Sequence, residues 1–200
     1  MPAWRKPHID TIAAPGNDAQ STEIGCQTPN PLRILSEEHA LQSELCDLLE
    51  AIADKLPQRP DGKLAQVALS ILEAGFLSHM RLEDDVLFPM LRQRAPQDHR
   101  LVAALACLEQ EHDRDGAAFI EIIDGLHTLI ADRPIRNPDM FGYMLRGFFE
   151  SQRRHIAWED SVVMPAARML LTGDDLRLLQ DRMIAGGQPW CSQRSVIASL

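Results

Sequence analysis

Residues 79–89 read HMRLEDDVLFP, and residues 155–165 read HIAWEDSVVMP. Each stretch begins with a histidine, and a glutamate follows four residues later, Glu83 in the first and Glu159 in the second. Four residues are about one helical turn, so both side chains of a pair lie on the same helix face. Apolar residues recur every three or four positions around each pair. This spacing predicts that two helices each turn an imidazole and a carboxylate towards a protein interior.

Two further histidines, His39 and His112, lie in apolar stripes of the same helical spacing but have no glutamate four residues on. Proline-bearing breaks at 57–60, near 96 and at 134–138 separate the four stripes. Strand-like alternation is not found over any length of the sequence. The pattern therefore predicts an all-α fold, an up-down-up-down four-helix bundle with one histidine on the inner face of each helix.

The segments outside the bundle are predicted from composition and capping residues. Residues 1–30 contain several prolines and glycines without an apolar period, which predicts a disordered N-terminal arm. Residues 31–171 form the predicted bundle. Residues 172–200 are predicted to hold a short fifth helix, opened by the capping-box pair Thr172 and Asp175, and a loose tail.

Composition and charge narrow the class of partner. The net charge is −9 and the pI near 5.2, which argues against nucleic acid and anionic membranes as partners, because both attract clustered Lys and Arg. No apolar run reaches the length of about 18 residues that spans a bilayer, and the N-terminus lacks the apolar stretch of a secretory signal. The four cysteines form no CxxC pair and suit a reducing compartment. We therefore expect a cytoplasmic protein.

The positions of the four histidines predict that their imidazoles share one level. In an up-down-up-down bundle, residues equally far from a turn lie at the same height. The midpoint between His39 and His79 is position 59, that between His79 and His112 is 95.5, and that between His112 and His155 is 133.5. Each midpoint falls in one of the proline-bearing breaks, so we expect all four imidazoles to meet at one site.

Buried carboxylates on these stripes point to bound metal. An isolated buried carboxylate costs several kcal/mol, and the stripes contain no Lys or Arg to pair with it. Imidazole and carboxylate ligands without thiolate suit iron, manganese or zinc, and six ligands are too many for one tetrahedral zinc. We therefore predict two ions bridged by two carboxylates. The alternative is that the stripes are only core. The predicted ligands are His39, His79, Glu83, His112, His155 and Glu159.

Four motifs resemble those of the haemerythrin-like, HHE cation-binding family. They are ILSEEHALQSELCDLLE, HMRLEDDVLFPML, EQEHDRD and HIAWEDSVVMP, and the resemblance covers about residues 31–185. It implies a non-haem centre of two iron ions with an oxo or hydroxo bridge, manganese or zinc being less expected. It also implies that His39 and His155 ligate one iron, that His79 and His112 ligate the other, and that both glutamates bridge.

The sequence departs from the oxygen-carrying members of the family. Those have a second histidine on the third helix, where this chain has Leu108 or Gly116, and their last motif ends in Asp five residues after the histidine. With four imidazoles, oxygen storage is less expected than binding or sensing of oxygen, nitric oxide or peroxide. The alternative is redox activity: peroxide decomposition, ferrous oxidation, or iron donation for repair of iron–sulfur centres. Residues 1–30 do not resemble the cysteine-bearing domain that repair members commonly add.

Polar residues beside the ligands have two possible roles. Gln42 and Gln152 lie three residues from His39 and His155 and are predicted either to hydrogen-bond the ligands or to sit at the core boundary. Glu38 and Glu111, which directly precede ligand histidines, are predicted to be solvated.

Overall fold

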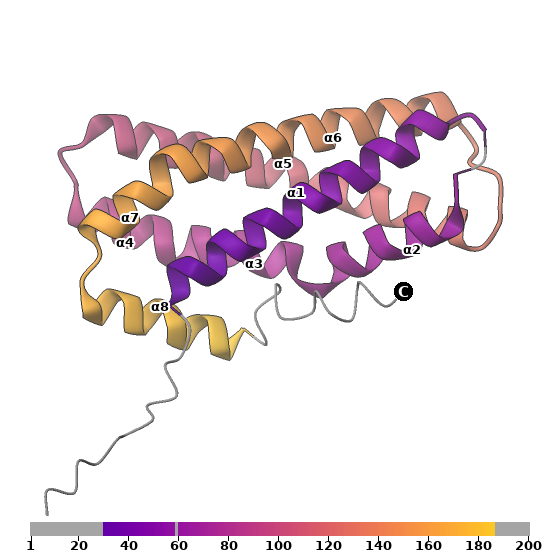
Figure 1. Cartoon of the computed structure of the whole chain (residues 1–200). Coiled ribbons are helices and arrows are strands. Elements are labelled where there is room, and N and C mark those ends of the chain that lie inside the picture. The colour runs from indigo at the N-terminus through magenta and orange to yellow at the C-terminus, as the bar shows by residue number, and fades with distance from the viewer. Residues whose placement is uncertain (1–29, 59, 187–200) are drawn as a thin grey trace, which may run out of the picture.

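The computed structural model describes residues 30–58 and 60–186, and these form helices joined by short turns (Figure 1). The first bundle helix is α1 (Pro31–Lys55). The second runs without interruption from residue 62 to residue 94. It comprises α2 (Gly62–Ile71), a π-helical turn (Leu72–Phe76), α3 (Leu77–Leu82), a second π-helical turn (Glu83–Leu87) and α4 (Phe88–Arg94).

The remaining two bundle helices follow the same pattern. The third is α5 (His99–Ile130), and the fourth runs from residue 138 to residue 170. The fourth comprises α6 (Pro138–Trp158), a π-helical turn (Glu159–Val163) and α7 (Met164–Leu170), and α8 (Gly173–Ala185) comes after it. The part of the chain that the structure describes contains no strand, so the all-α prediction is confirmed.

Each bundle helix begins at a capping side chain, and for the second, third and fourth helices this cap lies next to a break that the prolines predicted. The cap oxygen accepts a hydrogen bond from a backbone N–H of the first turn, which satisfies one of the donors that a helix start leaves open. These caps are Asn30, Asp61, Asp98 and Asn137. The fifth helix begins with the reciprocal capping box of Thr172 and Asp175, as predicted.

The bundle has up-down-up-down topology. α1 packs against both α2 and α6, and α5 packs against both α2 and α6, so every neighbouring pair is antiparallel (Figure 1). Figure 1 shows α8 at the end of the bundle where α4 meets α7. The predicted arm lies outside the described residues except for Asn30, and so do residues 187–200 of the predicted tail.

The core consists of two apolar clusters with a polar site between them. The loop-side cluster lies towards the turns at 56–61 and 131–137; its fully buried members include Leu45, Leu49, Ile52, Ile122 and Leu126. The α8-side cluster lies at the other end; its fully buried members include Leu35, Leu87, Phe88, Leu105 and Ala167. Leu179 and Met183 of α8 join the second cluster and close that end of the bundle.

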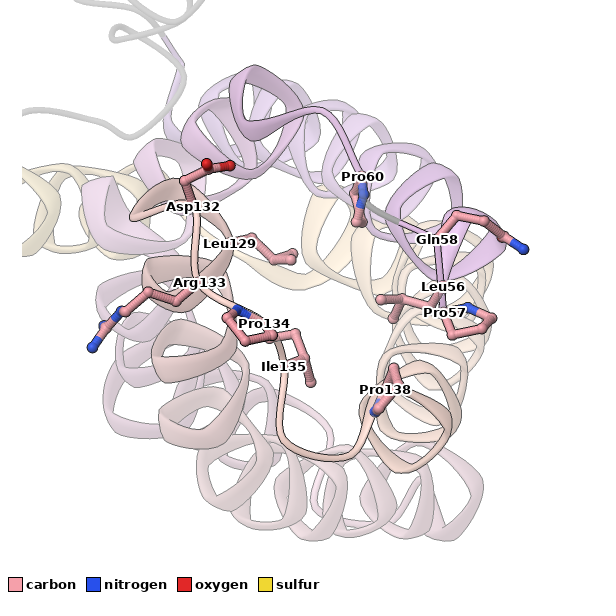
Figure 2. Close-up of a pocket in the computed structure, with 10 residues that line it drawn as sticks. All are labelled: Leu56, Pro57, Gln58, Pro60, Leu129, Asp132, Arg133, Pro134, Ile135 and Pro138. Carbon is pink, nitrogen blue, oxygen red and sulfur yellow. The ribbon is translucent and has the colours of Figure 1, made fainter.

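A pocket of about 400 Å³ opens at the loop end, far from the histidines. Figure 2 shows Leu56, Leu129 and Ile135 pointing into it, while Gln58 and Arg133 point away. Its lining contains no histidine or cysteine. Leu56 is 17 residues beyond His39 in the sequence, or about 25 Å along a helix. The pocket is therefore separate from the polar site.

Candidate metal centre

The two glutamates each open a π-helical turn, and a proline six residues later explains why. Pro89 and Pro165 have no backbone N–H, and the proline ring clashes with the carbonyl four residues back. The helix widens in the preceding turn. The backbone N–H of the residue before each proline bonds instead to the carbonyl of Glu83 or Glu159, five residues back. The motif HxxxEDxVxxP therefore sets the local shape of both helices at the site, where π-turns are often functional.

The six predicted ligands come together in the interior, each at most 4% exposed. Their nitrogen and oxygen atoms form two groups that share both glutamates, and within each group the ligand atoms lie within 4.8 Å of one another. The first group adds His39 and His79, and the second adds His112 and His155. The four imidazoles therefore share one level, as the turn midpoints predicted.

Each glutamate reaches histidines of both groups. The carboxylate of Glu83 lies 3.7 Å from Nε2 of His39, 3.4 Å from Nε2 of His79 and 3.6 Å from Nε2 of His112. The carboxylate of Glu159 lies 3.3 Å from Nε2 of both His39 and His155. This arrangement has the form of two neighbouring cation sites with two carboxylates between them.

The predicted pairing of histidines is wrong. The prediction placed His39 with His155 and His79 with His112, whereas the structure groups His39 with His79 and His112 with His155. The ring centroids of the first pair are 5.4 Å apart and those of the second 4.7 Å. In a four-helix ring every histidine has two neighbours at equal height, so the level alone does not choose between the two pairings.

Each imidazole donates a hydrogen bond through Nδ1 to a carboxylate of the preceding bundle helix. For the imidazole of the first helix, the carboxylate comes from the fourth. The carboxylate can only accept, so Nδ1 carries a proton, and in the neutral ring the lone pair of Nε2 points inward. The four bonds are His79 to Glu38 (2.8 Å), His112 to Asp84 (2.8 Å), His155 to Glu111 (3.0 Å) and His39 to Asp160 (2.7 Å).

The prediction that Glu38 and Glu111 are solvated is wrong. Glu38 is 4% exposed, and the side chain of Glu111 is 16% exposed. Each sits at the edge of the inner face and reaches sideways to the next helix. A repeat in the sequence marks them: Glu-His and then HxxxED occur once within residues 31–94 and again within 99–170. The same repeat marks the carboxylates that directly follow Glu83 and Glu159.

Four inward-facing atoms lack hydrogen-bond partners. Nε2 of His39, Oε2 of Glu83 and both carboxylate oxygens of Glu159 are buried without one. Buried unsatisfied polar atoms are rare in folded proteins and require an explanation. A cation between these atoms would satisfy all of them, so the cluster fits a metal site.

Neighbouring side chains stabilise the charged forms of His39, His155 and Glu159. Burial lowers the pKa of His39, but Asp160, Glu83 and Glu159 outweigh it and raise the value to about 10. Burial likewise lowers the pKa of His155, and its carboxylate neighbours, Glu159 first, raise it to about 9. Burial raises the pKa of Glu159, yet His155 and the other imidazoles bring it down to about 2. His39 and His155 therefore carry protons near neutral pH, and a bound metal ion can replace them.

The two glutamines that were predicted near the site are buried, but the structure shows neither of them bonded to a histidine. Gln42 and Gln152 are each 2% exposed, so neither sits at the core boundary. Gln152 donates to Asp115 at 2.6 Å and not to a histidine, and Oε1 of Gln42 has no hydrogen-bond partner. Asp115, which is 5% exposed, was missed by the sequence reasoning, although it lies three residues after His112 on the same face.

The comparisons with known proteins agree with this geometry. Residues 30–167 match the family model described as "Hemerythrin HHE cation binding domain". No curated protein and no solved structure matches the chain significantly. No helix in the described part of the chain is long and apolar enough to cross a membrane. The match covers more than half of the sequence and all six clustered side chains, and the chain therefore belongs to the haemerythrin HHE cation-binding family.

Proposed function

We propose that this protein holds two iron ions in a non-haem centre and binds or senses oxygen, nitric oxide or a related oxidant there. The observation that carries the proposal is the buried set of four imidazoles and two carboxylates, whose ligand atoms form two groups that share Glu83 and Glu159. Nε2 of His112 and Nε2 of His155 lie 3.0 Å apart. A shared proton stabilises this contact in the metal-free protein, and a cation would replace that proton in the loaded protein.

The ligand types also bear on the kind of ion. Imidazole and carboxylate ligands without thiolate suit iron or manganese, and six ligands are too many for one tetrahedral zinc. The family relationship makes iron the first choice.

The ligand count supports a role in binding small molecules. Each group supplies two imidazoles and two shared carboxylates, which leaves a six-coordinate ion with positions for an external ligand. When bound, iron would supply reversible electron transfer and those positions. The chain's own residues hold the four Nε2 lone pairs inward and exclude bulk water, because all six ligand side chains are buried.

The proposal places the protein in the cytoplasm. Cys46 and Cys107 are free thiols in the described part of the chain, and such thiols persist in reducing compartments.

Anaerobic loading with ferrous iron followed by oxygen or nitric oxide tests the function. We expect new visible absorption on addition of either gas, and loss of that change in Glu83→Ala. Glu73→Ala is the matched control, because Glu73 lies on the same bundle helix but is exposed and faces His127. Iron-loaded protein without any spectral response would overturn the proposal. Rapid consumption of added peroxide would instead show turnover, and so redox enzyme activity.

A further inference from the structure

A second polar layer lies one helical turn from the imidazoles. Gln42 follows His39 by three residues and Asp115 follows His112 by three, while Gln152 precedes His155 by three. The helix direction alternates around the bundle, so all three are displaced the same way, about 4.5 Å towards the loop-side cluster. They are 2%, 5% and 2% exposed, respectively.

The bridging carboxylates lie on the opposite side of the imidazoles. Glu159 follows His155 by four residues, whereas Gln152 precedes it. The same holds on the second helix, where Glu83 follows His79 towards α4. The protein carboxylates therefore cover the ions from the α8 side, and the side that faces the loop-side cluster is left for an external ligand.

The neighbourhood of the polar layer limits the size of such a ligand. Phe76 occupies the same level on the second bundle helix, because it precedes His79 by three residues. Its ring stacks on Phe119 with centroids 5.8 Å apart and lies 5.6 Å from Phe148. This aromatic group bounds the polar layer, which favours a ligand of only a few atoms.

The hydrogen-bonding state of the layer points to a polar ligand. Gln152 donates to Asp115 at 2.6 Å through one N–H of its amide, a group that carries two. Oε1 of Gln42 is fully buried without a partner, which is costly in an otherwise apolar core. Burial raises the pKa of Asp115, and the bond from Gln152 only partly opposes this. An apolar core at this level would need none of these groups.

We propose that Gln42, Asp115 and Gln152 form a specificity subsite that hydrogen-bonds a small polar ligand of the metal pair, of the peroxide or azide type. Gln42 contacts the ligand directly, and Asp115 fixes the amide of Gln152 so that its free N–H faces the ligand. The subsite selects ligands that accept or donate hydrogen bonds over nitric oxide, which does so weakly. This inference rests on the proposed function and narrows its choice of ligand.

Binding of azide, hydroperoxide and nitric oxide to the iron-loaded full chain tests the subsite. Azide only accepts hydrogen bonds, so we expect Gln152→Leu, which removes a donor, to weaken azide binding by about tenfold, with nitric oxide affinity nearly unchanged. Hydroperoxide also donates, so we expect Gln42→Leu, which removes the acceptor Oε1, to weaken hydroperoxide binding by about tenfold and to leave azide affinity nearly unchanged. Gln110→Leu, on the exposed face of α5, is the matched control and keeps all three affinities. Iron content and melting temperature are measured for every variant.

The outcomes separate this inference from the function on which it rests. Wild-type protein that takes up no iron, or that binds neither azide nor nitric oxide, overturns the proposed function. Wild-type protein that binds azide while Gln152→Leu, loaded with the same iron, binds it equally well overturns the subsite alone, and so does Gln42→Leu with unchanged hydroperoxide affinity. Equal weakening of azide and nitric oxide in the variants also contradicts it, because that result indicates general disturbance of the centre.

Discussion

Oδ1 of Asp160 lies 2.7 Å from Nδ1 of His39, and this contact joins the last bundle helix to the first. It closes a ring in which the carboxylate of each bundle helix orients the imidazole of the next. Because the contacts form a ring, a shift of one helix changes the orientation of two ligands. The bundle therefore holds the site in one geometry before metal binds, which lowers the cost of binding.

Removal of one carboxylate from this ring should weaken metal binding. Asp84→Ala leaves Nδ1 of His112 without its acceptor, and loss of such a partner typically lowers metal affinity about 10–100-fold. Competition with a coloured chelator measures the change. Asp85→Ala is the control, because this neighbouring residue is exposed and is not one of the acceptors. Equal affinity in the two variants would show that the ring does not position the ligands.

The stability of metal-free protein should fall as pH rises above neutrality. The pKa of His39 is about 10 and that of His155 about 9 in the folded protein, against 6.5 for the unfolded chain. A raised pKa stabilises the fold fully below pH 6.5, and the contribution is lost as pH approaches 9 to 10. Urea unfolding at pH 6 and pH 9.5 measures the loss.

The metal-loaded protein serves as the comparison in this experiment. Metal replaces the protons on the imidazoles, so its stability should depend less on pH and its metal affinity should rise from pH 6 to pH 9. A metal-free protein that gains stability over this range would contradict the raised pKa values of His39 and His155.

Truncation in the loop-side cluster should separate stability from metal binding. Leu49 is fully buried and ten residues beyond His39, about 15 Å along α1. Leu49→Ala should lower the free energy of unfolding by about 2–5 kcal/mol, as cavities of this kind do, with metal content unchanged. Met169→Ala is the control, because Met169 is 78% exposed and its truncation should cost less than about 0.5 kcal/mol. Loss of metal in Leu49→Ala would show that the two regions are coupled.

Loss of the capping box should loosen α8. Thr172→Ala removes the side chain that accepts from the backbone N–H of Asp175, and such changes cost about 1 kcal/mol. Asp175 also binds Arg94 of α4 through two hydrogen bonds of 2.8 and 2.9 Å, so the cap and the docking of α8 share one residue. Hydrogen exchange of α8 should accelerate in this variant and not in Ser161→Ala, an exposed residue of the fourth helix. Unchanged exchange would mean that the Arg94–Asp175 pair and the packing of Leu179 and Met183 hold α8 without the cap.

Local patterns in the sequence predicted the fold and the positions of the six clustered residues well. Apolar spacing and prolines act over a few residues, and helix direction then determines the heights of His39, His79, His112 and His155. These rules need no knowledge of side-chain contacts, which is why they succeed for the bundle and for the level of the site.

The predictions that failed concern features that depend on contacts between helices. Glu38 and Glu111 precede a buried histidine, and one step along a helix is a rotation of about 100°, so the pattern placed them in solvent. Their long side chains instead reach the neighbouring helix. Asp115 was missed because its partner, Gln152, lies on another helix. The pairing of histidines likewise depends on small lateral shifts that periodicity does not encode.

Anomalous X-ray diffraction at the iron absorption edge, from crystals of native protein, tests the central claim most directly. We predict two iron peaks per chain, one contacting His39 and His79 and the other contacting His112 and His155, with Glu83 and Glu159 between them. A single peak, a signal at the zinc edge alone, or two peaks that divide the histidines differently would contradict this account.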